Sequence, residues 1–309
     1  PSSQSACTIG GNVAMNSGGP HTLKYGVTTN HVLGFEMVLP DGEVHWFGTT
    51  PDGGEEVDGY DLRGAVIGCE GMFGIVTRVL VRLIKAPQAY KTMLGIFESV
   101  DAASQTVSDI IAAGIVPGAM EMMDQLITQA IEAAYHFGFP TDAGAVLIIE
   151  LDGLAAGLDR QAEQVERLCK KNGAREVRVA KTEQERADLW KSRKRAFGAI
   201  GRLSPNFLTQ DGVVPRSQLP AIMRFIRQTS NEIGLRIPNV FHAGDGNIHP
   251  LVLYDERDPG QVRRAIDAGN LILEKCIELG GSATGEHGIG VEKIDFMEKQ
   301  FTKEDLDAM

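Results

Sequence analysis

The chain has 309 residues and an ordinary globular composition, with 43% hydrophobic and 23% charged residues. Its 30 Lys and Arg against 41 Asp and Glu give a formal net charge of −11. This charge argues against nucleic acid or an anionic membrane surface as the main partner. No apolar run reaches the roughly 20 residues of a membrane span. Four scattered cysteines form no Cys-x-x-Cys pair, so we expect buried thiols in a reducing, cytoplasmic compartment.

Residues 1–26 are rich in Gly, Ser, Asn and Thr. Such a segment can bring backbone N–H groups close to a ligand, although plain surface turns have the same composition. Residues 32–47 predict a hairpin around Pro40-Asp41-Gly42. A second glycine-rich loop at 68–74 leads into an alternating strand at 74–83. No Gly-x-Gly-x-x-Gly joins a strand to a helix, so the pattern favours an α+β domain over a βαβ nucleotide fold.

A boundary is predicted at residues 85–89, which divides the chain into domains 1–85 and 86–309. In the second domain, strands alternate with helices, and an adjacent hairpin indicates antiparallel pairing. We therefore expect an antiparallel sheet covered by helices on one face. The predicted strands are 93–97, 145–151 and 176–180, and the predicted helices are 99–113, 121–137, 158–171, 183–200, 218–233 and 260–279.

The most informative stretch of this domain runs from Phe241 to Pro250. Gly and Asn tolerate positive φ, so residues 244–247 are predicted to form the turn of a hairpin. A hairpin folded there sets His242 and His249 nearly opposite one another. Two facing imidazoles are costly unless a divalent cation or an anionic substrate lies between them.

Residues 280–290 form a glycine-rich frame around Glu286 and His287. If this piece is extended, the two side chains point to opposite sides; the alternative is an ordinary turn with both side chains solvated. His287 could then accept a proton near neutral pH. Arg193, on a predicted helix, could bind a carboxylate in a bidentate pair, although its spacing also suits a solvated charge.

Two histidines and a carboxylate are a common ligand set for a divalent metal. His242, His249 and Glu286 fit this set, with Asp245 or Asn247 as outer support. Each histidine taken alone suits a hydrogen-bonded structural residue better than a ligand, and it is their grouping in two glycine-framed loops that supports the metal site. The nitrogen and oxygen donors suit Zn²⁺, Mn²⁺ or Fe²⁺.

Taken together, these loops resemble the FAD-linked 2-hydroxy-acid dehydrogenases, in the vanillyl-alcohol oxidase/p-cresol methylhydroxylase (PCMH) class of flavoproteins. The likeness covers essentially the whole chain and is strongest to the FAD-binding subunits of the glycolate oxidase (glycolate dehydrogenase) branch. It rests on Pro1-Ser2-Ser3-Gln4, the Cys7–Gly19 loop, the segment Glu70-Gly71-x-x-Gly74-Ile75-Val76, residues 33–42, 117–124 and 193–216, and the two histidine-bearing loops.

The resemblance implies the second half of a PCMH-type FAD-binding domain (1–85), followed by a substrate (cap) domain (86–309). It assigns the metal to His242, His249 and Glu286, the hydroxyl proton to His287, and the substrate carboxylate to Arg193. Asn247 would contact substrate or flavin. The residues that it assigns to FAD are Pro1, Gly10, Gly11, Asn12, Ala14, Gly18, Gly19, Glu70, Gly71, Gly74, Ile75 and Val76.

Three positions depart from the family pattern. Ser17 stands where Ala is usual and Cys69 where Ser is usual; both replacements are small. Thr209 stands where relatives specific for larger diacids carry Lys, which favours a small monoacid such as glycolate or D-lactate. The chain also starts at Pro1 without an initiator Met and lacks the family's preceding glycine-rich subdomain and C-terminal Asn-Pro-Gly-Lys segment. We therefore expect a fragment that alone binds FAD weakly or not at all.

The resemblance predicts that electrons pass to partner subunits, one a second flavin-type subunit and one an iron–sulfur protein. The complex would lie in the cytoplasm or peripherally on the inner face of the cell membrane. A stand-alone D-lactate dehydrogenase is the alternative within the class. A flavin-free metallohydrolase with a two-histidine, one-carboxylate site, and a non-catalytic subunit, are alternatives of other classes.

Overall fold

The computed structural model describes residues 3–54 and 59–309, which divide into two compact units. The N-terminal unit comprises Pro1–Ala86 and the later segment Glu286–Val291, and the C-terminal unit comprises Pro87–Gly285 and Glu292–Met309. Pro1, a predicted FAD contact, lies outside the described residues. No helix in the described ranges has both the length and the apolar character needed to cross a membrane.

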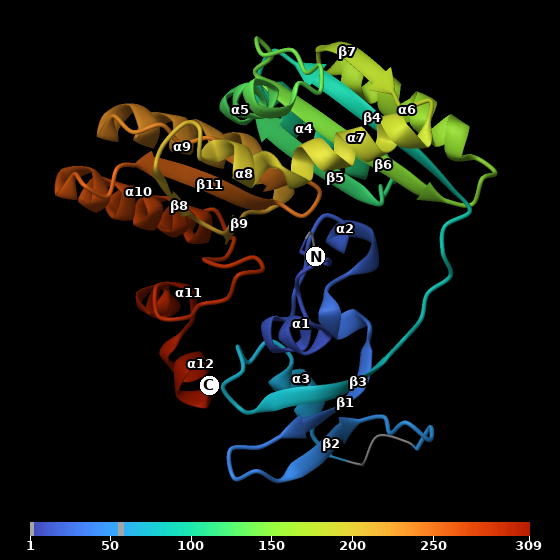
Figure 1. Ribbon diagram of the computed structural model, residues 1–309, viewed down its shortest axis with the longest axis vertical. Coiled ribbons are helices and arrows are strands. Elements are labelled where there is room, and N and C mark those ends of the chain that lie inside the picture. The colour runs from blue at the N-terminus through green and yellow to red at the C-terminus, as the bar shows by residue number, and fades with distance from the viewer. Residues whose placement is uncertain (1–2, 55–58) are drawn as a thin grey trace. The chain divides into compact units, whose positions relative to one another are not determined.

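The N-terminal unit is built on a three-stranded antiparallel sheet in the order β2-β1-β3 (Figure 1). The predicted hairpin is confirmed, because β1 and β2 pair around the turn at 39–43. Val13 from the first helix packs with Phe35 and Met37 of β1 in the core of this unit. The elements are α1 (Ile9–Met15), α2 (Thr22–Tyr25), the 3-10 turn η1 (Thr28–Asn30), β1 (Val32–Val38), β2 (Val44–Gly48), α3 (Leu62–Val66) and β3 (Ile75–Val81).

Part of the predicted N-terminal glycine loop is helical. Thr8 caps α1 by accepting a hydrogen bond from Gly11 N at 3.0 Å, and the helix then runs through Gly10 and Gly11. A side chain at Gly10 would meet Val76 O at 2.7 Å. Glycine at this position therefore lets α1 pack directly on β3. Without side chains, Gly10 and Gly11 also leave the backbone in the first turn of α1 uncovered.

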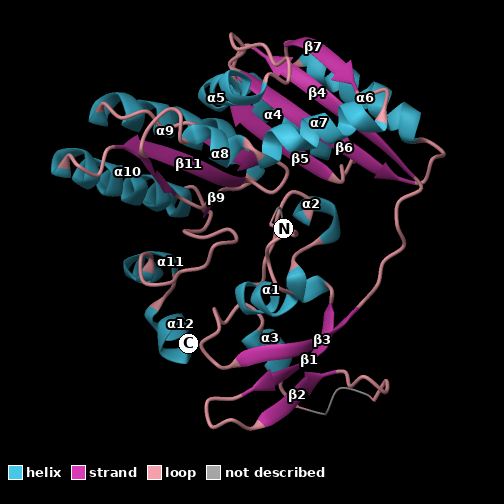
Figure 2. Ribbon diagram, in the orientation of Figure 1, coloured by secondary structure: helices cyan, strands magenta, loops and turns pink. Residues whose placement is uncertain are grey.

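The C-terminal unit contains an eight-stranded antiparallel sheet in the order β7-β4-β6-β5-β10-β11-β8, with β9 paired to β11 (Figure 2). The α+β class predicted from the sequence is confirmed. The strands are β4 (Ala89–Phe97), β5 (Ala119–Asp124), β6 (Ala145–Gly153), β7 (Ala174–Val179), β8 (Asn206–Thr209), β9 (Gly212–Val213), β10 (Asn239–His242) and β11 (Asn247–Tyr254).

Helices cover both faces of this sheet, so the expectation of helices on one face was wrong. Val146 and Ile148 of β6 point into a core shared with α5 and α8, whereas Leu147 and Ile149 point to the other face. That other face carries α4, α6, α9 and α10. The helices are α4 (Val100–Ala112), α5 (Gln125–Tyr135), α6 (Leu158–Lys171), α7 (Glu183–Lys194), α8 (Ala196–Ile200), α9 (Leu219–Ile233), α10 (Pro259–Glu278), α11 (Met297–Gln300) and α12 (Lys303–Ala308), with 3-10 turns η2 (Arg216–Gln218) and η3 (Ile294–Phe296).

Two predicted helices have different bounds in the structure. Residues 119–124 form β5 between β6 and β10, so the helix predicted from residue 121 begins only at Gln125. Asp124 ends the strand and caps α5 by accepting from Ile127 N at 3.0 Å. The helix predicted at 183–200 is interrupted at Arg195, where α7 ends and α8 begins.

Candidate active site

The histidine hairpin forms, but its register differs from the prediction. The turn is 243–246, and Asn247 already belongs to β11. His242 therefore pairs with Asn247, and His249 pairs with Val240. The two histidines are diagonal neighbours on one face of the sheet. Their ring centroids are 5.1 Å apart with the planes at 88°.

A buried carboxylate, Glu121 of β5, holds one of these histidines. Its Oε1 lies 2.7 Å from His242 Nδ1 and its Oε2 lies 2.7 Å from Arg193 Nε, and the Glu121 side chain has no exposed surface. Burial alone would raise the pKa of Glu121, but the charges of His242 and Arg193 hold it below its ordinary value. A carboxylate at Nδ1 favours the tautomer in which Nε2 offers its lone pair.

Arg193 comes from the last turn of α7 and is only 4% exposed. Its Nε contact with Glu121 is an ion pair, because the N–H direction does not meet the oxygen in hydrogen-bond geometry. Within the described ranges its two Nη atoms make no hydrogen bond, and they are not fully enclosed. The alternative of a solvated Arg193 therefore does not hold: the side chain is buried, and its Nη donors remain available to an anion.

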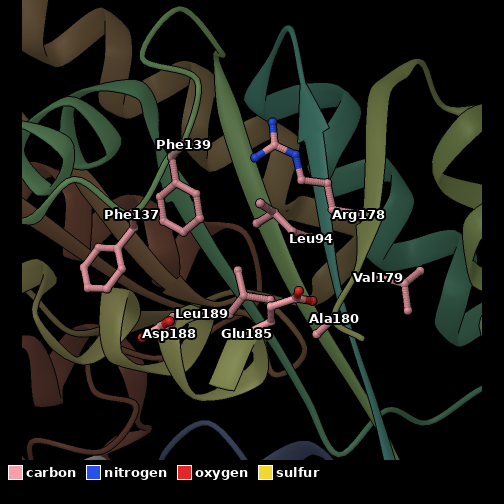
Figure 3. A pocket seen from close by; sticks show the side chains of 9 residues that line it. All are labelled: Leu94, Phe137, Phe139, Arg178, Val179, Ala180, Glu185, Asp188 and Leu189. Carbon is pink, nitrogen blue, oxygen red and sulfur yellow. The ribbon is translucent and has the colours of Figure 1, made fainter. Parts of the chain in front are cut away.

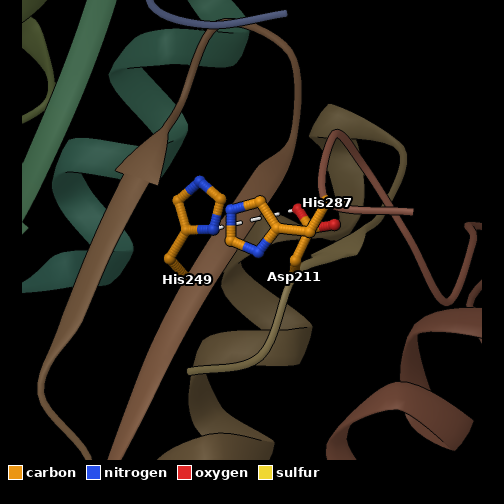
Figure 4. A group of neighbouring side chains, drawn as sticks. All are labelled: Asp211, His249 and His287. Carbon is orange, nitrogen blue, oxygen red and sulfur yellow. Dashed lines mark ion pairs between the residues drawn. The ribbon is translucent and has the colours of Figure 1, made fainter. Parts of the chain in front are cut away.

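Asp211, between β8 and β9, organises the surroundings of the second histidine. Its Oδ1 lies 3.8 Å from His249 Nδ1, the ion pair drawn in Figure 4, and accepts a hydrogen bond from Asn247 Nδ2 at 3.1 Å. Lys293 Nζ lies 3.5 Å from its Oδ2. Burial lowers the pKa of Lys293, and the nearby Asp211 charge opposes that shift. His249 also meets the ring of Phe197 at 6.3 Å between centroids.

The Asn247 side chain is 6% exposed, and its orientation is fixed by Asp211, which accepts from the amide nitrogen. The amide oxygen, Oδ1, is fully buried and has no hydrogen-bond partner within the described ranges. A buried acceptor without a donor is costly, so a ligand donor at this point would satisfy it.

Asp211 also holds the start of the glycine-rich loop at 284–290. Its Oδ2 accepts from Thr284 Oγ1 and from Gly285 N, both at 2.9 Å. A side chain at Gly285 would overlap the Asn247 amide. The next peptide bond leads to Glu286, whose Cα is about 3.8 Å from that of Gly285.

Glu286 and His287 pack with the N-terminal unit. Glu286 Oε1 lies 4.0 Å from His287 Nε2, so the two side chains approach each other. The chain bends here and Gly288 has φ of 88°, so the extended alternative, in which the two side chains point to opposite sides, is not the one observed. Glu286 Oε2 would lie 3.5 Å from a Cβ at Gly18, which brings Glu286 beside the predicted flavin loop.

Glu70 anchors the far end of the same loop. Its carboxylate accepts from Ile289 N at 2.5 Å and Gly290 N at 2.9 Å. Its own backbone has φ of 56°, a conformation that a residue other than Gly seldom adopts without a reason. The side chain predicted to serve FAD is thus engaged with the segment that carries His287.

The remaining residues predicted to serve FAD line α1 and the loops beside it. Gly11 is exposed at the start of α1, and Gly18 and Gly19 are buried at its far end. In the described ranges, Ile9 N and Gly10 N have no hydrogen-bond partner. Asn12 and Ala14 belong to α1, Gly71 and Gly74 flank the loop before β3, and Ile75 and Val76 begin that strand.

A separate cavity of about 230 Å³ lies between β4, β7 and α7 (Figure 3). Its walls include Leu94, Phe137, Phe139 and Leu189, and none of the predicted site residues. Arg178 at its edge is already bound by Glu176 through two hydrogen bonds of 2.9 and 3.0 Å. Glu185 and Asp188 also line the cavity, but no histidine does, so it does not combine metal-ligand types as the histidine cluster does.

The sequence interpretation missed two central residues, Glu121 and Asp211. Glu121 was the only ionisable residue in the apolar run 119–123. That position is a signal, since an ionisable group in a buried strand is retained only with partners. Asp211 had no such signal, because it lies between short strands in a polar stretch.

Comparison with known proteins identifies the chemistry that this framework serves elsewhere. A family described as "FAD linked oxidases, C-terminal domain" matches residues 86–309, and one described as "FAD binding domain" matches residues 1–48. The chain is 46% identical over 306 residues to the glycolate oxidase subunit GlcD of Escherichia coli strain K12, covering 99% of this chain and 61% of that protein. It is 30% identical over 298 residues to a D-lactate dehydrogenase of Anaerostipes hadrus, covering 94% and 62%.

Among solved structures, p-cresol methylhydroxylase with bound substrate superimposes with a TM-score of 0.69 at 17% identity, covering 92% of this chain and 62% of that one. The fold is thus of the PCMH type, as predicted. The chain spans about three fifths of the length of the relatives it matches. These comparisons give no support to the metallohydrolase alternative.

Proposed function

The chain belongs to the family of FAD-linked oxidases, and from this we propose that it takes part in FAD-dependent oxidation of a short 2-hydroxy acid to the 2-oxo acid. Glycolate is the first candidate substrate and D-lactate the second. The observation that carries the proposal is the buried set Arg193, Glu121 and His242, joined by two contacts of 2.7 Å. In this set, Glu121 links Arg193, a cation suited to binding a carboxylate, to His242, a candidate metal ligand.

Arg193 binds the substrate carboxylate in this proposal. Its Nη atoms have no hydrogen bond within the described ranges, and the side chain is almost fully enclosed. A charge-assisted bidentate pair is strongest in such low-dielectric surroundings. Asn247 Oδ1, a buried acceptor with no donor in the described ranges, accepts the hydroxyl of the substrate or an N–H of the flavin.

His242, His249 and Glu286 would hold a divalent cation: Zn²⁺, Mn²⁺ or Fe²⁺. The donor set fits, because the Glu121 carboxylate at Nδ1 of His242 favours the tautomer with a lone pair on Nε2, and the two imidazoles lie 5.1 Å apart between centroids. When bound, such a cation polarises the substrate oxygens. His287 then takes the hydroxyl proton, for which its half-exposed position gives an exit to solvent.

The N-terminal unit would contribute to FAD binding through α1 and the loops beside it. The start of α1 supports this assignment, since Ile9 N and Gly10 N have no acceptor in the described ranges and glycines permit close approach. FAD held there would supply the acceptor for the hydride that leaves the substrate Cα. Because its carboxylate is occupied, Glu70 would support FAD by its backbone position. We propose residues 1–85 as part of the FAD-binding domain and 86–309 as the substrate domain.

The proposal extends to an assembly. A relative named as a glycolate oxidase subunit supports a complex in which electrons pass to a second flavin-type subunit and an iron–sulfur subunit. Such a complex would be cytoplasmic, with peripheral attachment to the inner face of the membrane through the partners. A stand-alone D-lactate dehydrogenase is the second candidate, favoured by the 30% identity to a protein of that name.

The test is reduction of the flavin in the full-length protein. A flavin absorption spectrum that bleaches anaerobically with glycolate supports the proposal, and bleaching only with D-lactate favours the second candidate. Replacement His287→Ala is expected to slow the bleaching while leaving the oxidised spectrum unchanged. A protein that carries no flavin, or bleaching unaltered by His287→Ala and Arg193→Met, would contradict the assignment. A flavin that neither glycolate nor D-lactate bleaches is what a non-catalytic subunit predicts.

A further inference from the structure

Glu121 joins two groups to which the proposed function gives different tasks. We infer that Glu121 is a positioning residue that fixes the metal ligand His242 and the carboxylate-binding Arg193 at the same time. This inference rests on the proposed function. It predicts that metal binding and substrate binding are coupled through one buried side chain.

The first half of the coupling acts on His242. The His242 Nδ1 to Glu121 Oε1 distance of 2.7 Å lies in the range of charge-assisted hydrogen bonds. The bond fixes both the tautomer and the rotation of the ring. Partners of this kind behind a ligating histidine typically contribute 10- to 100-fold to metal affinity.

The second half acts on Arg193. Oε2 of the same carboxylate lies 2.7 Å from Nε, at the base of the guanidinium. The pair neutralises a buried cation, and within the described ranges neither Nη atom of Arg193 makes a hydrogen bond. Without Glu121, the enclosed Arg193 would keep its positive charge with no carboxylate beside it, and that buried charge would be destabilised.

A second carboxylate offers a matched control. Glu150 lies on the same face of the sheet, is also fully buried, and also binds an arginine of α7, Arg186, at 2.8 Å. Its other partners are Thr92 and Trp190, and among the described residues no hydrogen bond or ion pair joins it to the proposed site. A role that is merely structural should therefore be shared by Glu121 and Glu150.

The experiment compares Glu121→Gln with Glu150→Gln in the full-length protein. The metal-stripped protein is titrated with Zn²⁺ alone and Mn²⁺ alone by calorimetry, and the KM and kcat for glycolate are measured on the FAD-loaded enzyme. We expect Glu121→Gln to weaken metal binding about 10- to 100-fold and to raise KM more than it lowers kcat. Glu150→Gln should lower the melting temperature and change neither the metal affinity nor the KM for glycolate by more than about twofold.

Unchanged metal affinity and KM in Glu121→Gln, alongside loss of metal binding in His242→Ala, would overturn the inference and leave the proposed function intact. A wild-type protein that binds neither metal would instead refute the proposed metal site. If Glu121→Gln does not fold, Glu121→Asp decides by the same titrations. It keeps the charge but shortens the reach, so unchanged metal affinity and KM there would also overturn the inference.

Discussion

Glu121 and Glu150 occupy equivalent surroundings in the sheet and yet have different kinds of partner. Strand register pairs Glu121 with Ile148 and Ala119 with Glu150, which puts both carboxylates on the same face. Each side chain is fully buried, and each meets an arginine from α7. For each, burial raises the pKa, and the partners more than offset this and hold the pKa below its ordinary value.

The difference lies in how the arginine is bound. Glu150 accepts two hydrogen bonds from Arg186, from Nε at 2.8 Å and Nη2 at 3.1 Å, and one each from Thr92 and Trp190. Arg186 also lies 4.0 Å above the ring of Tyr90, so its fork is committed to the fold. Arg193 Nε lies 2.7 Å from Glu121 Oε2, and within the described ranges neither Nη atom of Arg193 makes a hydrogen bond. A buried ion pair alone thus does not identify a ligand-binding site. What identifies one is an arginine whose N–H donors are not all used by the protein.

The strongest test exchanges each arginine for methionine. Arg193→Met removes the carboxylate clamp and leaves Glu121 without its cation, so kcat/KM for glycolate should fall about 100- to 1,000-fold. Arg186→Met should reduce the stability of the protein and leave kcat/KM nearly unchanged in the folded fraction. The measurements are steady-state kinetics and thermal unfolding of both variants. Equal losses of activity would remove the distinction between the two ion pairs.

Asp211 extends the comparison to a carboxylate that holds a backbone as well as side chains. Its bond to Gly285 N fixes the residue before Glu286. In Gly285→Ala, the new methyl group would overlap the Asn247 amide and come within 2.9 Å of Asp211 Oδ1. Displacing the loop by about 1 Å should lower kcat about 100-fold and weaken Zn²⁺ binding.

The matched control for that variant is Gly198→Ala in α8. A Cβ at Gly198 meets only Tyr135 Oη, at 3.7 Å, and alanine favours a helix over glycine by up to about 1 kcal/mol. This variant should keep full activity and gain slightly in melting temperature. Activity retained in Gly285→Ala would mean that the anchoring of the loop by Asp211 has no bearing on the site.

Much of the C-terminal unit was predictable because local patterns there agree with the tertiary structure. The helix predicted at 158–171 has the bounds of α6, and the helix predicted at 99–113 agrees with α4, which Ser99 caps. The failures concern short apolar runs, for which helix and strand periodicities cannot be distinguished. Residues 119–124 form a strand only because β6 and β10 pair with them on both sides.

The residues of the candidate site also divide into those with a local sequence signal and those that only the tertiary structure brings together. His242, His249, Glu286 and His287 stand in glycine-framed loops, and that local signal was enough to single them out. Glu121 lies 121 positions from His242 along the chain, and no local pattern links them. The one-residue error in the hairpin turn also decided which residue faces His242, because only the ladder fixes the register.

Asp124 supplies the remaining contrast, a buried carboxylate with no arginine or lysine ion pair in the described ranges. Burial raises its pKa to about 6, although the N–H groups of Ile127 and Asn239 favour the charged form. An unfolded Asp titrates near 4, so between about pH 4 and 6 the folded protein holds a proton that the unfolded chain has released. Stability must therefore fall as the pH rises through that window, by roughly 2 kcal/mol.

Urea unfolding of the wild type and Asp124→Asn at intervals from pH 4 to 7.5 isolates this contribution. The unfolding free energy of the wild type minus that of Asp124→Asn should fall as the pH rises from 4 to 6 and stay constant at higher pH. Glu150→Gln should behave with the opposite sign, since a lowered pKa gives Glu150 a stabilising effect that is present above about pH 4.3 and lost as the pH falls through its folded value. Parallel curves for Asp124→Asn and the wild type would mean that the N–H donors alone compensate for the burial of Asp124. The presence of an arginine partner would then not explain why Glu150 and Asp124 affect stability differently.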